Sequence, residues 1–199
     1  MPMSDLEILK ELIREEALVT LEDGLYGKRK VTLIEPKNPC HSEYTVDINN
    51  IPTNAIVIKT DTFPAPKPIF KGSKGEYKRA DFVIIAETII KNKPNNLIIF
   101  IELKKGKGNS EASIIQQLKG AQCIIAYCRS IGQVFWQQPD FLNPDKYEYR
   151  FVSIRNIEIN KKVSFEKPKQ GLHDSPAQML KITLTNHLEF KQLVGKVTR

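Results

Sequence analysis

Glu102 and Lys104 combine charge with an apolar setting near the middle of the chain. They follow a continuous apolar run from Leu97 to Ile101. Such a run is typical of a central strand that is buried on both faces. Residues two apart in a strand project to the same face, so these two side chains would lie roughly 7 Å apart. The spacing therefore predicts a carboxylate and an ammonium group side by side at the end of a buried strand.

Asp81 is expected to lie beside this pair. It belongs to the apolar stretch 79–86, and a turn over 92–96 would join that stretch to the next strand as a hairpin. Two carboxylates brought together in this way, Asp81 and Glu102, repel each other unless a cation lies between them. Oxygen ligands of this kind suit Mg²⁺ or Mn²⁺. Because Lys104 could orient a water or stabilise charge on a phosphate, the group predicts a metal-assisted phosphodiesterase.

The N-terminal segment offers one more carboxylate. A capping box formed by Ser4 and Glu7 precedes a periodic apolar stretch and predicts a helix over 5–21. At about 100° per residue, Glu16 falls within the apolar face of this helix, whereas its neighbour Glu15 lies well away from it. A carboxylate on an apolar face is costly unless it is paired or bound to a metal. Glu16 is therefore a candidate member of the site, and pairing with a structural Arg or Lys is the alternative.

The other elements follow from alternating and apolar stretches. Besides 79–86 and 97–103, strands are predicted over 30–34, 44–48, 55–60, 132–136, 147–154 and 180–185. Ser110 or Asn109 would cap a second helix over 111–128. The order is helix, several strands, helix and strand, which predicts an α/β domain whose sheet is partly antiparallel.

Composition limits the partners and the compartment. The 199 residues carry 30 Lys and Arg against 23 Asp and Glu, so the net charge of +7 favours a polyanion, with nucleic acid first. A hydrophobic content of 41% excludes wholesale disorder. The three cysteines lack CxxC spacing, so neither a disulfide framework nor a zinc site is expected. The sequence shows no targeting signal and no apolar run long enough to span a bilayer, so we expect a cytoplasmic protein without a membrane partner.

Two basic loops, at 71–79 and 105–108, could hold a nucleic-acid backbone through its phosphates. The second loop lacks the residue spacing of a nucleotide-binding P-loop. A solvated basic surface is the alternative for each residue. The candidate nucleic-acid-binding residues are Lys71, Lys74, Lys78, Arg79, Lys105 and Lys107.

The motif residues resemble those of the PD-(D/E)XK nuclease superfamily. Asp81 is followed by twenty residues and then by Glu102, Leu103 and Lys104, between a first and a second predicted helix. Ala80 stands in place of the superfamily's nominal Pro. The resemblance implies a restriction-endonuclease-like fold with an αβββαβ core and a central mixed sheet flanked by helices. That core would occupy residues 1–155, with 156–199 as a C-terminal extension of the same domain.

The resemblance also implies roles for single residues. Asp81 and Glu102 would be metal ligands, the backbone carbonyl of Leu103 would be a third, and Lys104 would be the catalytic lysine. Glu16 would match the carboxylate that many members carry on their first helix.

The second predicted helix carries a further partial match. Gln117, Leu118 and Ala121 are similar to the Gln-containing helix motif of the RecB-like branch, although Ala121 stands where that branch has Tyr. Gln117 would therefore be a catalytic residue, and Gln116 or Gln122 could serve instead.

The function implied by the resemblance is hydrolysis of DNA phosphodiester bonds by an endonuclease that uses Mg²⁺, with Mn²⁺ able to substitute. Bacterial defence, restriction or repair is the context expected from it. Two alternatives stay open: a catalytically inactive nucleic-acid-binding or regulatory module with the same fold, and a ribonuclease such as a toxin. DNA is expected over RNA as the partner, and so short a chain could act as a homodimer or with a partner subunit.

Overall fold

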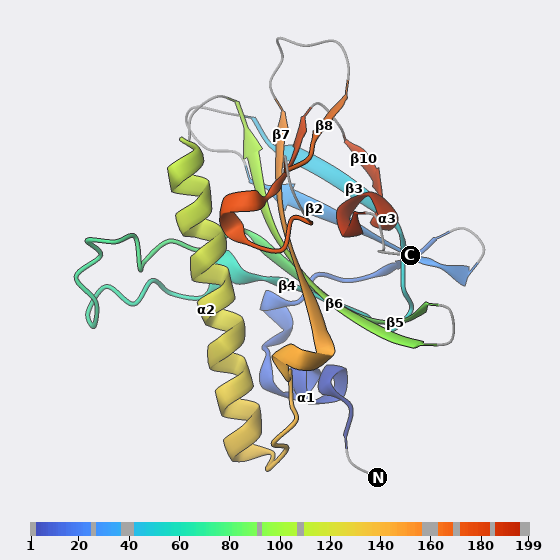
Figure 1. The fold of residues 1–199 in the computed structure, drawn as a ribbon, viewed down its shortest axis with the longest axis vertical. Helices are drawn as coiled ribbons and strands as arrows, with labels where there is room; N and C mark the ends of the chain where they lie inside the picture. Colours follow the sequence, from blue (N-terminus) through green and yellow to red (C-terminus); the bar gives the residue numbers. More distant parts are fainter. Residues whose placement is uncertain are drawn as a thin grey trace.

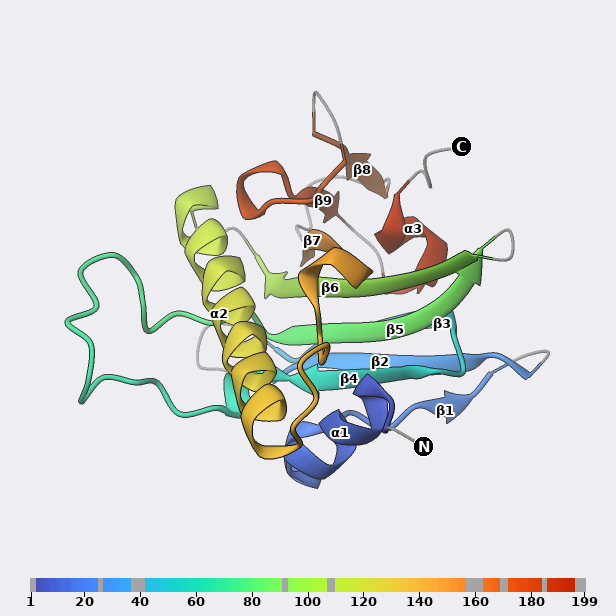
Figure 2. The ribbon, with the colours of Figure 1, turned by 60° about the horizontal axis from the view of Figure 1, so that its bottom comes forward.

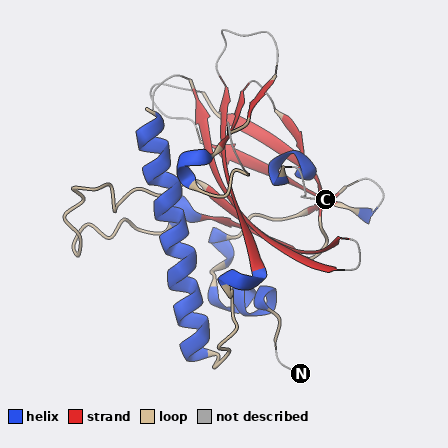
Figure 3. Cartoon of the chain, in the orientation of Figure 1, coloured by secondary structure: helices blue, strands red, loops and turns tan. Residues whose placement is uncertain are grey.

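The computed structural model describes residues 3–24, 27–36, 42–90, 93–106, 110–156, 163–168, 172–183 and 186–195. Within these residues the chain is a mixed α/β protein with two mixed sheets and three α-helices, one of them long (Figures 1 and 3). The fold class predicted from the sequence is confirmed at this level.

The helices and strands of the described residues are, in chain order, α1 Asp5–Leu12, β1 Glu22–Asp23, β2 Arg29–Glu35, β3 Tyr44–Ile51, β4 Ala55–Lys59, β5 Phe82–Ile90, β6 Lys93–Lys105, α2 Glu111–Phe135, β7 Tyr147–Asn156, β8 Ser164–Glu166, β9 Leu180–Thr183, β10 His187–Glu189 and α3 Phe190–Val194. Short 3₁₀ turns lie at Glu15–Ala17, Thr60–Thr62, Pro144–Lys146 and Pro176–Gln178. The larger sheet has the strand order β4-β5-β6-β7-β9-β8, and the smaller sheet has the order β1-β2-β3-β10.

The larger sheet is built around β5 and β6. These two strands form the predicted antiparallel hairpin, although Asn95 and Asn96, which were expected in its turn, already belong to β6. The chain then crosses through α2 to β7, which lies parallel to β6. Ser110, one of the two predicted N-cap residues, caps α2: its hydroxyl accepts a hydrogen bond from the amide N–H of Ser113.

Each face of the larger sheet covers a separate apolar core. Alternate residues of β6 point in opposite directions, so Leu97, Ile99 and Ile101 pack toward the smaller sheet. Ile98 and Phe100 pack toward α1 and α2 on the other face. The resemblance implied one central sheet flanked by helices. Instead, α1 and α2 cover one face, and the second sheet with α3 covers the other.

The predicted helix over 5–21 is wrong beyond its first eight residues. The capping box at Ser4 is present, but α1 ends at Leu12 and the backbone becomes extended at Ile13. The chain then pairs with the edge of the larger sheet, where the amide N–H of Val19 donates to the carbonyl of Val57 at 2.9 Å. Pairing with an open strand edge satisfies this backbone better than a longer helix would.

The predicted strand over 132–136 is also wrong, because α2 continues to Phe135. Gly132 explains why the helix can pass this point. A Cβ atom there would lie only 2.1 Å from the ring of Phe141, so the ring packs directly on the helix backbone. Val134 and Phe135 are apolar and exposed, which gave the segment the appearance of a strand.

The C-terminal part of the chain adds to both sheets. β9 lies parallel to β7 in the larger sheet, and β10 lies parallel to β3 in the smaller one. α3 contributes Phe190, Leu193 and Val194 to the core between the sheets. Among the described helices, none has the length and apolar composition needed to cross a membrane.

Candidate active site

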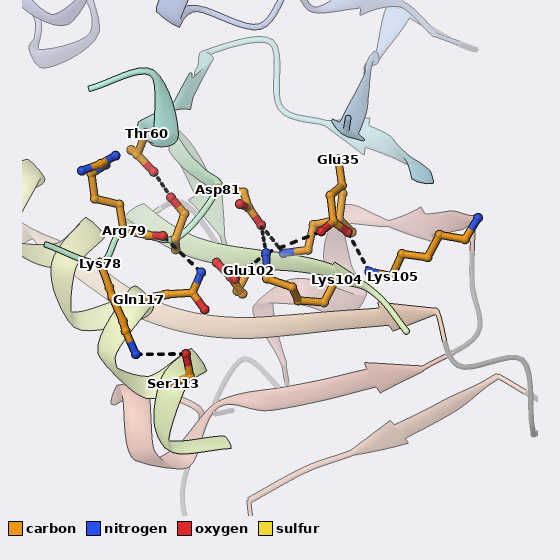
Figure 4. Close-up of polar contacts among 12 residues, drawn as sticks. Glu35, Thr60, Lys78, Arg79, Asp81, Glu102, Lys104, Lys105, Ser113 and Gln117 are labelled. Atoms are coloured by element: carbon orange, nitrogen blue, oxygen red, sulfur yellow. Dashed lines mark hydrogen bonds and ion pairs between the residues drawn. The ribbon is translucent and has the colours of Figure 1, made fainter. Parts of the chain in front are cut away.

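The β5–β6 hairpin brings the three predicted motif residues together. Phe82 lies opposite Ile101, so Asp81, which precedes β5, lies beside Glu102. The ammonium nitrogen Nζ of Lys104 lies 3.0 Å from Oε1 of Glu102 and 3.8 Å from Oδ2 of Asp81 (Figure 4). The three side chains form one cluster at the end of the most buried strand pair.

The backbone around Asp81 is fixed by hydrogen bonds. Thr60 is fully buried, and its hydroxyl donates to the carbonyl of Ala80 at 2.5 Å while its amide N–H donates to the carbonyl of Asp81 at 2.8 Å. The amide N–H of Leu103 donates to Oδ2 of Asp81 at 2.7 Å. The carboxylate is therefore held in place by the protein itself. The role of the Leu103 carbonyl as a metal ligand stays a prediction.

Glu35 is a member of the cluster that sequence reasoning missed. It ends β2 in the smaller sheet, and its carboxylate lies 3.5 Å from Nζ of Lys104 and accepts the amide N–H of Lys105 at 2.6 Å. A carboxylate at the end of an apolar strand is the same signal that identified Glu102. The sequence could not reveal that two distant strand ends meet, so Glu35 was left out.

Burial dominates the electrostatics of the cluster. The side chain of Glu102 is 0% exposed, and burial, with Asp81 nearby, raises the pKa of Glu102 well above its usual value. Burial also raises the pKa of Asp81 to about 6, although the Lys104 ammonium and the Leu103 amide act in the opposite direction. Burial would lower the pKa of Lys104, but the carboxylates of Asp81 and Glu102 raise it above its ordinary value. The ammonium group of Lys104 therefore pairs with three carboxylates, those of Glu35, Asp81 and Glu102.

Two buried side-chain oxygens at the cluster have no hydrogen-bond donor within the described part of the chain. They are Oε2 of Glu102 and the amide oxygen of Gln117, and Figure 4 shows the two side chains next to each other. The other carboxylate oxygen of Glu102, Oε1, meets the ammonium group of Lys104 at 3.0 Å. Gln117 reaches this place because α2 packs tightly on the chain before Asp81: a Cβ atom on Gly120 would lie 1.7 Å from the carbonyl of Lys78. The amide of Gln117 makes a long contact of 3.5 Å with the carbonyl of Arg79.

These donor-free oxygens fit a divalent cation in part. Buried oxygen acceptors without protons are the ligands that Mg²⁺ and Mn²⁺ take. Across the described ranges, however, no three His, Cys, Asp or Glu side chains gather closely enough to hold a metal by themselves. Asp81 and Glu102 therefore fit an ion that completes its shell with main-chain oxygen and water, as Mg²⁺ commonly does.

Glu16 is not brought to this cluster. It lies in the 3₁₀ turn after α1, its side chain is 73% exposed, and its ion pair is with Arg14 at 3.6 Å. The expectation that it lies on a buried helix face is wrong, because α1 ends before it. Of the other two glutamines considered, Gln116 binds Lys78 instead of the cluster, and Gln122 lies five residues beyond Gln117, on a different side of α2.

The predicted basic residues divide into exposed and internally bound ones. Lys71 and Lys74 are exposed, as expected for contacts with phosphates. Lys78 donates to Ser113 at 3.1 Å and to Gln116 at 2.7 Å. Arg79 is half-buried and donates to the carbonyl of Tyr77, and Lys105 donates to the hydroxyl of Ser42. Lys107 lies outside the described residues.

The chain was compared with models of known protein families, with curated proteins and with solved structures, and none of the three comparisons found a match.

Proposed function

We propose that this chain is a metal-dependent endonuclease that hydrolyses DNA phosphodiester bonds and has a restriction-endonuclease-like core. The order of elements supports the proposal. When the smaller sheet is set aside as an addition, α1, β4, β5, β6, α2 and β7 follow one another as αβββαβ. The motif residues lie on the second and third of these strands or next to them, where the resemblance to the PD-(D/E)XK superfamily assigns them.

The observation that carries the proposal is the cluster of Asp81, Glu102 and Lys104. A lysine within 4 Å of two largely buried carboxylates, one of which has an oxygen without a hydrogen-bond donor, is more than a surface ion pair. Burying such charges is costly, and a fold retains them where they are needed for chemistry. Two carboxylates and a lysine at a strand end match the chemistry of phosphodiester hydrolysis.

Each residue of the cluster would have its own role in phosphodiester hydrolysis. Asp81 and Glu102 would hold Mg²⁺, which supplies a Lewis acid that lowers the pKa of a water molecule and polarises the phosphate. The ammonium group of Lys104 would position the attacking water or stabilise the charge that develops on the phosphate. Glu35 would keep Lys104 in place through its ion pair. Gln117 would offer its amide to the same space (Figure 4).

The proposal is tested by digestion of plasmid DNA, linear DNA and RNA with Mg²⁺, Mn²⁺ or EDTA. We expect cutting of DNA that requires a divalent metal and that is lost in Glu102→Ala and Lys104→Ala. Glu22→Ala is the matched control, since it removes an exposed glutamate whose only described partner is a surface lysine.

Three results would contradict all or part of the proposal. Full cutting by Glu102→Ala and Lys104→Ala would show that the activity lies elsewhere. No cutting of any substrate, together with salt-sensitive DNA binding that needs no metal, would favour the inactive binding module. Cutting restricted to RNA would replace DNA as the substrate while keeping the assignment of the cluster.

A further inference from the structure

A projecting segment leads directly into the candidate site. Residues 63–79, the basic arm, connect the turn Thr60–Thr62 to the chain before Asp81 and extend outward past α2 (teal in Figures 1 and 2). The arm contains five Lys or Arg residues and one Glu. A segment with this charge attracts a polyanion, and its position attaches that polyanion close to the cluster.

The tip of the basic arm is apolar and exposed. Ile69 is 77% exposed and Phe70 is 50% exposed, and they follow a turn in which both backbone N–H groups donate to the carbonyl of Pro66. Lys67 and Lys71, both exposed, flank the pair. An adjacent pair of large apolar side chains exposed to this extent is unfavourable for an isolated chain and indicates a surface that meets a partner.

The root of the basic arm is anchored on the first turns of α2. Gln116 donates from its amide to the carbonyl of Lys74 at 3.1 Å and accepts Lys78 at 2.7 Å. Within the arm, the hydroxyl of Tyr77 donates to the carbonyl of Phe70. Pro64, Pro66 and Pro68 restrict the backbone of the outgoing strand of the arm. The tip is therefore presented in a set direction, which reduces the entropy lost on binding.

We propose that the basic arm binds duplex nucleic acid, with Ile69 and Phe70 inserted between base steps in the minor groove and the flanking lysines on the phosphates. Apolar side chains used in this way partly unstack the bases and bend the duplex. The inference rests on the proposed function for its choice of partner, and it narrows the substrate to a duplex that is distorted close to Asp81. An anionic membrane is the other surface that a basic and apolar loop could meet, but the arm leads to the cluster and carries only two exposed apolar residues at its tip.

The test measures how the full chain binds a DNA duplex that contains 2-aminopurine, a base whose fluorescence rises on unstacking. EDTA is present so that the DNA is not cleaved during the measurement. Wild type is expected to bind and to raise the fluorescence. Ile69→Ser combined with Phe70→Ser is expected to lose the fluorescence rise and to bind about fivefold more weakly or worse, because one aromatic stacking contact is lost.

Two control variants separate insertion of Ile69 and Phe70 from the loss of any exposed apolar surface and from the loss of positive charge. Val134→Ser combined with Phe135→Ser removes an apolar pair that is 70% and 76% exposed and lies roughly 27 Å along α2 from Gln116 at 1.5 Å per residue, and this variant should bind as wild type does. Lys67→Gln combined with Lys71→Gln should reduce the slope of log affinity against log salt by about 2. At saturation this lysine variant should keep the fluorescence rise.

The outcomes that would overturn the role of the arm differ from the outcome that would overturn the proposed hydrolysis. A tip variant that binds and unstacks the duplex as wild type does overturns the role of the arm. So does a tip variant that loses only its binding to phosphatidylserine vesicles, which would assign the tip to a membrane. Duplex binding that depends on the tip, with no cleavage under Mg²⁺ or Mn²⁺, would overturn hydrolysis and leave the role of the arm intact.

Discussion

Arg150 and Glu102 are both buried charged residues on neighbouring strands, but their surroundings differ. Arg150 donates to the carbonyl of Val194 at 2.8 Å and to the carbonyl of Tyr149 at 2.8 Å, and it forms an ion pair with Glu148. Within the described chain, Oε2 of Glu102 has no hydrogen-bond donor, and the one cation beside this carboxylate is the ammonium group of Lys104, 3.0 Å from Oε1.

The comparison separates a structural charge from one that is available for chemistry. A buried cation whose three nitrogens each donate to a protein oxygen joins elements together, here β7 and the end of α3. A buried carboxylate with unused oxygen lone pairs adds little to stability, and its pKa shift shows the free-energy cost of holding it there. Substitutions at the two places should therefore have opposite consequences.

The largest effect is expected for Glu102→Gln. Removing the charge while keeping the shape should lower the rate of metal-dependent cleavage about 10²- to 10³-fold, as for other losses of electrostatic stabilisation. The free energy of unfolding should stay the same or rise, because an amide is cheaper to bury than a carboxylate. Single-turnover cleavage and urea unfolding of the same preparation measure the two effects. A large loss of stability with normal cleavage would show that Glu102, like Arg150, has a structural role instead of a chemical one.

Arg150→Met should give the opposite result. The substitution leaves two carbonyl groups without their donor, so the free energy of unfolding should fall by about 2–4 kcal/mol. The cleavage rate per folded molecule should not change, since no described contact links Arg150 with the cluster around Lys104. Urea unfolding checks the first expectation. A slower cleavage rate in protein shown to be folded would contradict the second.

Glu35→Gln tests how far the smaller sheet contributes to the site. The variant keeps an acceptor for the amide N–H of Lys105 but removes one of the three charges around Lys104. We expect cleavage to fall about 10- to 100-fold, as is usual when a group that orients a catalytic residue is changed. The conservative variant Glu35→Asp should recover part of the rate. Equal rates for Glu35→Gln and wild type would remove Glu35 from the site.

Addition of Mg²⁺ should stabilise wild type and not Glu102→Gln. At a free concentration ten times its Kd, a ligand that binds only the folded state adds about 1.4 kcal/mol. Thermal unfolding with Mg²⁺ and then with EDTA measures this without relying on activity. The same shift in both proteins would mean that the ion binds somewhere other than Glu102.

His173 should give the smallest effect, in the region of Arg150. Burial lowers its pKa, so the unfolded chain takes up the proton more readily than the folded one. Its contribution to stability is therefore present above the unfolded pKa of about 6.5, and it is lost as the pH falls below that value through the lower folded pKa. His173→Gln does not titrate and can still donate to the carbonyl of Leu193, which His173 contacts. The difference in unfolding free energy between the two proteins should vary with pH only below neutrality.

The parts of the site that lie close together in the chain were predictable. Asp81 and Glu102 meet across a hairpin, so alternation and a turn were sufficient to bring them together. Glu16 was placed wrongly because helical periodicity was extended past the true end of α1 at Leu12. The signal that ends this helix is the edge of a distant strand, which no local pattern contains.

The remaining parts depend on contacts between distant segments. Glu35 reaches Lys104 only because the smaller sheet packs on the larger one, and strand pairing of this kind is set by tertiary packing. The end of α2 was misassigned for a related reason, since Gly132 is tolerated in the helix where the ring of Phe141 covers it. Local sequence shows which residues have unusual chemistry but not which distant residues join them.

The parallel pairing of β10 with β3 has a consequence for synthesis of the protein. His187 pairs with Asp47, so β3 is synthesised long before the strand that pairs with it. Until then β3 has an open edge, and an open edge in a nascent chain is prone to pair with other chains. We expect the growing polypeptide to depend on chaperones until residues 187–194 emerge from the ribosome, and to fold slowly because of this long-range contact.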